Sequence, residues 1–225
     1  MPAVGFRINT TFARPPRDLI DSFAGLPVAN IADCMSRMFC IAGPIRPLNN
    51  AALLGPAFTV RARPGDNLLL HKAIDLAAPG DIVVVDGQGD MANSLIGELM
   101  IRWSIRRGVG GFIIDGAVRD VSYLRTLSLP VYAAGVNPAG PYKEGPGEIN
   151  VPISCGGVTV NPGDILVGDQ DGVVVIAPAD AADVLQKARA KLKDEQKTIE
   201  EIDRGTWDRT WVDKALAAKG CQIIG

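Results

Sequence analysis

Residues 81–87, DIVVVDG, decide the fold of this sequence. Their apolar centre is continuous and does not alternate with polar residues, which is typical of a strand buried on both faces of a parallel sheet. A second run of this kind is GGFIIDG, residues 110–116. Helical patterns lie before and after these runs, and strands that alternate with helices indicate an α/β fold with two packed sheets or layers.

The N-terminal part is expected to contain short helices and one strand. One or two helices, interrupted near Pro27, come first. The alternating, β-branched stretch 57–63 predicts a strand. A helix follows, which Asp66 is expected to cap and Pro79–Gly80 to end.

Between the two buried strands, the polar residues 87–93 are interpreted as a loop. The next segment predicts a helix with Ser94 as its N-cap and Gly108 just past its end. A short helix and a strand are expected within 123–135. Three or four short strands are expected within 148–178.

The C-terminal part predicts one long helix, from about 179 to 204, and a short tail with two tryptophans. Leu185, Leu192 and Ile199 recur every seven residues along this helix, and Glu195 falls on the same stripe. A charge on an apolar stripe needs a partner, a metal or a water-filled site. The alternative is that Glu195 lies at the edge of the stripe and pairs with Lys191.

The length, the hydrophobic fraction and the net charge indicate how many domains and which kinds of partner to expect. The 225 residues are 47% hydrophobic, which is enough for one sizeable core, and no linker suggests a second domain, so a single domain over 1–225 is expected. The formal net charge of −2 is spread along the chain without a basic block, which argues against nucleic acid and anionic membranes as partners.

The cysteines and the N-terminus favour a cytoplasmic protein. Cys34, Cys40, Cys155 and Cys221 form no CxxC pair, and with a single histidine they do not suggest a zinc site. Reduced thiols are therefore expected. The N-terminus lacks the apolar segment of a signal peptide, and no apolar stretch approaches the roughly 20 residues that span a bilayer.

The candidate site lies after the two buried strands. In α/β sheets, ligands bind outside the carboxyl ends of the strands. The helix after the first strand would offer free backbone N–H groups to a carboxylate or phosphate, and Gly97 would let a ligand approach the backbone closely. The segment lacks the lysine and the glycine spacing of common nucleotide sites.

Charged residues around this site allow two interpretations each. Glu98 is either part of a site or compensates the dipole of its helix. Asp120 is either functional or the N-cap of the following helix. Arg119 fits a structural role less well, because a cation near a helix N-terminus opposes the dipole and requires a negative partner such as Glu98 or an anionic substrate.

The remaining polar candidates are interpreted as structural. Asp86, Asp90 and Asp115 are expected to be turn residues, because Asp-Gly is an ordinary turn signal. The single histidine, His71, has no nucleophile motif around it and is interpreted as a partly buried histidine with a local partner.

Taken together, Glu98, the 20 residues after it and Arg119–Asp120 resemble a family signature, an acidic residue followed by x20-Arg-Asp. It is that of the class II 4-hydroxy-4-methyl-2-oxoglutarate/4-carboxy-4-hydroxy-2-oxoadipate aldolases and the related RraA-like regulators of ribonuclease E. The stretches PGDNLLLHKAIDLAAPGDIVVVDG, GELM, DGAVRDV and GDQDGVVVIAP are similar to this family too. The resemblance covers roughly residues 20–205.

This resemblance implies a three-layer β/β/α sandwich of the swivelling-domain type, assembled as homotrimers or homohexamers. It also implies a divalent cation, Mg²⁺ or Mn²⁺, between subunits. Asp120 would be the direct metal ligand, and Glu98 would hold the metal through water. Glu195 of a neighbouring subunit would also act through water, which would explain its place on an apolar stripe.

The resemblance further implies that Arg119 binds the carboxylate and carbonyl of a keto acid. Backbone N–H groups of Gly97, Glu98, Leu99 and Met100 would complete the cradle. The expected reaction is retro-aldol cleavage of a 4-hydroxy-2-oxo di- or tricarboxylic acid to pyruvate and a second oxo acid. Oxaloacetate decarboxylation is expected as a side activity, because both reactions pass through pyruvate enolate.

Two alternatives stay open at this point. One is an RraA-type protein that binds and regulates ribonuclease E without aldolase turnover. The other is an enzyme of the same enolate chemistry that acts on a different hydroxy-oxo acid. The family's aldolases carry a long C-terminal helix with an acidic residue, which the regulators tend to lack, so the helix with Glu195 favours the enzyme.

Overall fold

The computed structural model describes residues 3–224. Its elements, in chain order, are β1 (Phe6–Ile8), α1 (Arg17–Asp21), α2 (Val28–Cys34), β2 (Cys40–Ile41), β3 (Arg46–Pro47), β4 (Leu53–Ala62), α3 (Leu68–Leu76), β5 (Ile82–Ile96), α4 (Glu98–Arg107), β6 (Gly111–Val118), α5 (Val121–Leu124), β7 (Val131–Val136), β8 (Gly147–Ile149), β9 (Ile153–Cys155), β10 (Val158–Val160), β11 (Ile165–Asp169), β12 (Gly172–Ile176), α6 (Ala181–Asp203) and α7 (Thr210–Ala218).

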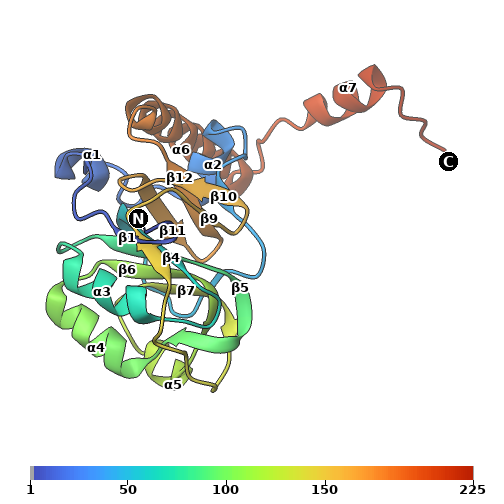
Figure 1. The fold of residues 1–225 in the computed structure, drawn as a ribbon. Helices are drawn as coiled ribbons and strands as arrows, with labels where there is room; N and C mark the ends of the chain where they lie inside the picture. The colour runs from blue at the N-terminus through green and yellow to red at the C-terminus, as the bar shows by residue number, and fades with distance from the viewer. Residues whose placement is uncertain (1–2, 225) are drawn as a thin grey trace. The chain divides into compact units, whose positions relative to one another are not determined.

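A large mixed sheet organises the fold (Figure 1). Its strand order is β2-β12-β11-β4-β5-β6-β7-β3, and β8 pairs with both β4 and β1. The central strands β4, β5, β6 and β7 are parallel neighbours, as the two continuous apolar runs predicted. Strands β11 and β12 extend the sheet in antiparallel pairing, and β9 and β10 form a separate hairpin.

The residues of β5 show why a continuous apolar run suits this position. Val83 and Val85 pack into a core that also contains residues of α3 and α4, which lie together on one side of the sheet (Figure 1). Ile82 and Val84 point the other way, into a core shared with β11, β12 and the β9–β10 hairpin. Because both faces of β5 are covered, both sets of alternate side chains must be apolar.

These cores define a three-layer α/β structure, in agreement with the expected fold. The helical layer of α3 and α4 covers the parallel strands, and the strands β11 and β12 with the β9–β10 hairpin form the second β layer. A third core lies on the outer face of β11 and β12. There, Ile165 and Val174 contact the cluster formed by α1, α2 and the first turns of α6.

Several predicted elements are confirmed. Two short helices, α1 and α2, lie on either side of Pro27's position, with Pro27 itself preceding α2. The predicted helix after Asp66 is α3, but its bounds differ from the prediction: Asn67 and not Asp66 is its N-cap, and it ends at Leu76, before Pro79–Gly80. Oδ1 of Asp66 accepts a 2.9 Å hydrogen bond from the N–H of Leu68. Gly108 ends α4 in the left-handed conformation, with a φ of 77°.

The predicted loop at 87–93 and the predicted N-cap at Ser94 are wrong. Strand β5 continues through this polar stretch to Ile96, and its pairing with β6 shifts register three times between Asp86 and Ile96. Ser94 lies in this strand and donates its hydroxyl to the carbonyl of Ala139, at 2.8 Å. Helix α4 therefore begins at Glu98, with Gly97 as its N-cap.

Smaller differences concern element boundaries. The strand predicted at 57–63 is β4, which already begins at Leu53. Five short strands, β8 to β12, occupy the region where three or four were expected. The long helix expected at 179–204 is α6, and the tail after it contains a further helix, α7.

Packing divides the described chain into two compact units, whose boundary lies between Ala188 and Arg189, inside α6. The single domain expected over 1–225 stays a prediction. Among the residues that the structure describes, no helix is both long enough and apolar enough to cross a membrane.

Candidate active site

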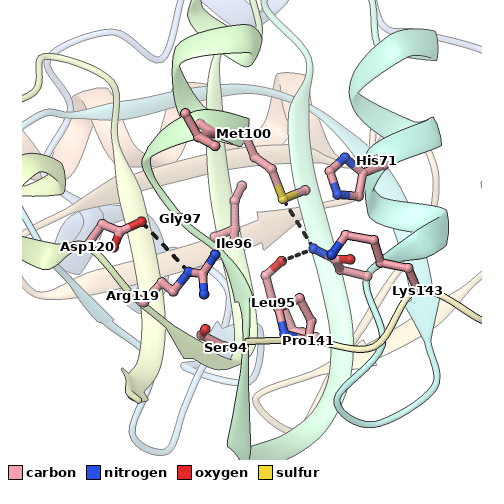
Figure 2. A pocket seen from close by; sticks show the side chains of 12 residues that line it. His71, Ser94, Leu95, Ile96, Gly97, Met100, Arg119, Asp120, Pro141 and Lys143 are labelled. Atoms are coloured by element: carbon pink, nitrogen blue, oxygen red, sulfur yellow. Dashed lines mark hydrogen bonds and ion pairs between the residues drawn. The ribbon is translucent and has the colours of Figure 1, made fainter. Parts of the chain in front are cut away.

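A cavity of about 220 Å³ lies where β5 and β6 end and where α4 and α5 begin (Figure 2). Five of the predicted site residues line it: Gly97, Leu99, Met100, Arg119 and Asp120. Because β5 and β6 are parallel neighbours, their carboxyl ends meet at the edge where α/β sheets bind ligands. We call this cavity the Arg119–Asp120 pocket.

Asp120 lies between β6 and α5 in the left-handed conformation, with φ of 59° and ψ of 36°. It takes the N-cap position of α5, but its side chain makes no cap hydrogen bond to that helix. Its Oδ2 instead accepts a 2.8 Å hydrogen bond from the backbone N–H of Glu98. The carboxylate is thus held at the N-terminus of α4, where the helix dipole favours negative charge, while 43% of the side chain stays exposed.

The backbone of Arg119 is hydrogen-bonded to the last residue of β5, and its side chain faces the pocket. Its N–H donates a 3.0 Å hydrogen bond to the carbonyl of Ile96 at the end of β5. The guanidinium lies next to Asp120, with Nε 3.8 Å from Oδ2 (Figure 2). An ion pair between half-exposed groups is worth at most about 1 kcal/mol, so the positive charge remains available to an anionic ligand.

Gly97 permits the close approach of these side chains to the start of α4. A Cβ at this position would collide with Oδ2 of Asp120 and would lie 3.0 Å from Cγ and 3.1 Å from Nε of Arg119. Its backbone is extended, so the requirement for glycine here comes from space and not from backbone strain. The pocket was expected to need a glycine for the approach of a ligand, and the structure shows that it is also needed for the protein's own side chains.

Glu98 opens α4, but its side chain does not line the pocket. Its Oε1 accepts a 2.7 Å hydrogen bond from Nε of Arg102, one helical turn later. The guanidinium of Arg102 in turn lies 4.4 Å from the ring centre of Tyr123. In this structure the carboxylate pairs with Arg102, and the role of Glu98 towards a metal stays a prediction.

Glu195 lies on α6 beyond Ala188 and thus in the second compact unit. Its Oε1 is 3.1 Å from Nζ of Lys191, which is the pair that the alternative interpretation named. The side chain is 43% exposed. The contribution of Glu195 to the site of a neighbouring subunit stays a prediction.

The structure adds three polar residues that the sequence did not assign to the site: Asn67, His71 and Lys143. His71 lies on α3, and its pKa is lowered, first by burial and then by the positive charge of Lys143. Asn67 is 2% exposed, and its amide nitrogen donates to the carbonyl of Leu95 at 2.9 Å. Their sequence signal was weak, because the residues lie 48 or more positions before Arg119 or 24 after it.

The Asp-Gly residues of β5 and β6 have structural partners on another face of the sheet. Asp86 and Asp115 are opposite each other in the β5–β6 register. They therefore lie within strands, and the prediction that they are turn residues is wrong. Asp86 accepts hydrogen bonds from the N–H groups of Gln88 and Ser154, and burial raises its pKa. Oδ2 of Asp115 accepts a 3.3 Å hydrogen bond from the N–H of Gly156.

Asp90 also lies within β5 and not in a turn between elements, although its contacts are local. Its carboxylate accepts hydrogen bonds of 3.2 Å from the N–H groups of Ala92 and Asn93. These bonds coincide with one of the register shifts against β6, so Asp90 supports the irregular course of the strand.

The donor set of the pocket is compatible with a hard, water-rich cation. Within residues 3–224 no three histidine, cysteine or acidic side chains converge. Mg²⁺ instead keeps several waters and needs one or two carboxylates. Asp120 provides such a carboxylate, since its Oδ2 is engaged by a neutral N–H and no hydrogen bond within the described chain uses Oδ1.

Comparison with known proteins shows the family to which this chain is similar. The family model described as "RraA-like: Aldolase/RraA" matches residues 28–175. A protein of Halalkalibacterium halodurans named "Putative 4-hydroxy-4-methyl-2-oxoglutarate aldolase" is 41% identical over 180 residues, which cover 80% of this chain and 86% of that protein.

Two solved structures share the fold over most of their length. One is an uncharacterized protein of Pseudomonas syringae pv. tomato, with a TM-score of 0.77 and 25% identity, covering 86% of this chain and 96% of that one. The other is RraAS2 of Streptomyces coelicolor, described as an unusual member of the RNase ES inhibitor RraA family. It has a TM-score of 0.75 and 26% identity, covering 84% of this chain and 100% of that one.

Proposed function

This chain belongs to the RraA-like (aldolase/RraA) family, and from that premise we propose that it is a divalent-metal-dependent pyruvate aldolase. Its substrate is a 4-hydroxy-2-oxo di- or tricarboxylic acid of the 4-hydroxy-4-methyl-2-oxoglutarate type. Cleavage between C3 and C4 releases pyruvate and a second oxo acid. The observation that carries this proposal is the adjacent placement of Arg119 and Asp120 at the N-terminus of α4, inside one pocket.

Binding of the substrate starts with its C1 carboxylate and keto oxygen. Arg119 offers a planar guanidinium that can donate two parallel hydrogen bonds to such a group. The first turn of α4 adds the N–H groups of Leu99 and Met100, which have no intrahelical acceptor. The N–H of Glu98 is already engaged by Asp120, so it is not part of this cradle.

The reaction develops negative charge on the keto oxygen as the C3–C4 bond breaks. Arg119 lies ready to stabilise this charge, an effect that a fixed donor typically provides at about 3 kcal/mol. Asp120 would hold the divalent cation, Mg²⁺ or Mn²⁺, whose chemistry here is that of a Lewis acid towards the same oxygen. A water held by the metal or by Arg119 would take the proton of the 4-hydroxyl group.

Assembly and the remaining acidic residues belong to the same proposal. We expect a homotrimer or homohexamer in which Glu195 of one subunit reaches the site of the next through water. Glu98 would reach the cation through water after release from Arg102, which is an exchange between partners on the exposed surface of α4. Oxaloacetate decarboxylation should accompany the aldolase reaction, because it forms the same enolate.

The test is pyruvate release from 4-hydroxy-4-methyl-2-oxoglutarate, coupled to lactate dehydrogenase, with Mg²⁺ and then with EDTA. Oxaloacetate is measured in parallel. Metal-dependent cleavage of the hydroxy acid establishes the aldolase. Decarboxylation alone keeps the enolate site and rejects this substrate, in favour of a different hydroxy-oxo acid.

A second candidate function is regulation of ribonuclease E by protein binding, which the similarity to RraAS2 supports. Helix α6 with Glu195 favours the enzyme, because the family resemblance implies that the aldolases carry a long C-terminal helix with an acidic residue, which the regulators tend to lack. If neither substrate is turned over by metal-loaded protein, the aldolase proposal is wrong and co-purification with ribonuclease E becomes the next measurement.

A further inference from the structure

The Arg119–Asp120 pocket has a second polar end that the proposed chemistry at C1 to C3 does not use. Lys143 and His71 lie on the opposite side of the cavity from Arg119 and Asp120 (Figure 2). Asn67 lines the cavity as well. A hydroxy-oxo acid has two halves of different chemistry, so two chemically different pocket ends correspond to what such a substrate requires.

Lys143 is anchored to the pocket by its neighbours in the chain. The buried carboxylate of Asp66 accepts hydrogen bonds from the N–H groups of Glu144, at 2.7 Å, and Gly145, at 2.9 Å. The carbonyl of Tyr142 accepts a 3.0 Å hydrogen bond from the N–H of Asn67. The backbone on both sides of Lys143 is therefore fixed against the start of α3, and its ammonium group is delivered to this end of the pocket.

Asn67 points to a ligand with a hydrogen-bond donor. Its side chain is 2% exposed, and its nitrogen donates to Leu95 and to the sulfur of Met100. Its Oδ1 is buried and has no hydrogen-bond partner in the described chain. A buried acceptor without a donor costs free energy, and a ligand with a donor in the cavity that Asn67 lines would remove this cost.

Asn67, Lys143 and His71 together match one chemical group. Two nitrogen-bearing side chains suit a carboxylate, and a lone acceptor beside them suits a hydroxyl group. We propose that these residues form a subsite for the distal α-hydroxycarboxylate of the substrate, in which Lys143 and His71 bind the carboxylate and Oδ1 of Asn67 accepts a hydrogen bond from the hydroxyl group. This assignment rests on the proposed function and names which half of the substrate decides specificity.

The charges around this subsite leave it cationic. Asp66 is engaged by three N–H groups of its surroundings, those of Leu68, Glu144 and Gly145. Asp75, the acidic residue that acts on His71, accepts a 3.0 Å hydrogen bond from the indole of Trp103. Neither carboxylate is paired with Lys143 among the ion pairs of residues 3–224.

The test uses matched ligands in equilibrium binding to the full-length protein with Mg²⁺. The first pair is 2-oxoglutarate and 2-oxopentanoate, which differ only in the distal carboxylate. We expect 2-oxoglutarate to bind about tenfold more tightly, the value of one charge-assisted hydrogen bond at a partly exposed site. Lys143→Met should bring this ratio close to one, whereas the control Lys72→Met, a neighbouring exposed lysine outside the pocket, should retain it.

The second pair is citramalate and methylsuccinate, which differ only in the hydroxyl group beside a carboxylate. Wild-type protein should prefer citramalate, because only its hydroxyl can donate to Oδ1 of Asn67. Equal binding of this pair would overturn the role of Asn67. Equal binding of the first pair, or an unchanged ratio in Lys143→Met, would overturn the subsite as a whole.

The chain has one histidine, so the imidazole resonance of His71 reports on this end of the pocket without any turnover. Binding of 2-oxoglutarate should raise the pKa of His71, since it brings a negative charge next to the ring, and 2-oxopentanoate should leave it unchanged. If these effects occur but no hydroxy acid is cleaved, the proposed reaction fails and the subsite stands. If cleavage occurs and the binding ratios do not respond to Lys143, the subsite fails and the reaction stands.

Discussion

Two pairs of charged residues belong to this part of the sheet, one within β5 and β6 and one directly after β6, and they have different roles. Asp86 and Asp115 face each other across the two strands and accept N–H groups of the β9–β10 hairpin, at Ser154 and Gly156. Asp120, with Arg119 before it, faces the pocket and the start of α4. Both pairs contain an aspartate from the β6 region, but the neighbours of these aspartates differ.

The difference comes from the geometry of the backbone. Side chains alternate across a strand, so Asp86 falls on the same face as Ile82 and Val84, which is the face that the second β layer covers. Asp120 comes after β6 has ended, and its left-handed conformation turns the chain into α5 and the carboxylate towards α4. In this protein the aspartates within the strands are covered by the second β layer, and the aspartate that follows β6 lines the pocket.

The largest effect is expected from Asp120→Ala. Loss of the metal ligand should lower kcat/KM by about 1,000-fold or more, and loss of the bond to Glu98 should lower the free energy of unfolding by about 1 kcal/mol. Steady-state kinetics and thermal unfolding measure both. Asp115→Asn is the matched variant from the structural pair and should keep its turnover, so equal losses in the two variants would erase the distinction between the pairs.

Arg119→Ala should reduce kcat/KM by about 100-fold to 1,000-fold, because it removes a fixed donor to the keto acid. Near-normal kinetics in this variant would reject the assignment of Arg119 to the active site.

The same variant tests the predicted role of Glu195. Mixed oligomers of inactive Arg119→Ala and Glu195→Ala subunits should regain part of the activity, and verified mixed oligomers without any recovery would show that Glu195 does not serve a neighbouring site.

Gly97→Ala should have an intermediate effect on activity and a small one on stability. The added methyl group collides with Oδ2 of Asp120 and approaches Arg119, so both side chains must shift. Displacement of catalytic groups by about 1 Å can cost about 100-fold in rate. The backbone at Gly97 is extended and tolerates alanine, so a variant that unfolds instead of losing activity would contradict this account.

The smallest effect concerns Asp86 and is a change of stability with pH. Burial raises the pKa of Asp86 in the folded protein above the value of about 3.9 for an unfolded chain. Its contribution to stability is thus fully present below about pH 3.9 and is lost as the pH rises through the folded pKa. The Asp86→Asn variant has no carboxylate to ionise at this position, so it does not lose this stability. The difference in free energy of unfolding, variant minus wild type, should therefore increase as the pH rises from about 3.9 through the folded-state pKa of Asp86.

Chemical denaturation at a series of pH values measures this difference, and a constant difference would reject the assignment. Turnover of Asp86→Asn should stay close to that of the wild type, since Asp86 does not line the pocket.

Much of the fold could be predicted because its strongest signals are local. The continuous apolar runs at 82–85 and 112–114 identify central parallel strands, since a strand covered on both faces has no polar positions. The polar stretch 87–93 could not be identified as a strand in this way. Its place in β5 depends on pairing with β6 through three register shifts, a long-range interaction that overrides the local preference of Gly, Gln and Asp for turns.

The residues of the candidate site also include some that the local sequence predicts and some that it does not. Arg119 and Asp120 could be predicted because they follow the apolar run of β6, and Gly97 because it was expected in the first turn of the helix after β5. The structure brings all three together in the pocket. Lys143 could not, because the chain reaches this position after β7 and is held there by hydrogen bonds to residues 65–67.

The continuation of β5 through its polar residues also decides where this protein can be engineered. Read as a loop, the stretch 87–93 would be an attractive place for an epitope tag, a fluorophore attachment sequence or new chain termini. Its backbone instead pairs with β6 and leads directly into Gly97. Insertions succeed where the backbone is exposed and free of such pairing, so a tag placed here would break the sheet and misdirect α4.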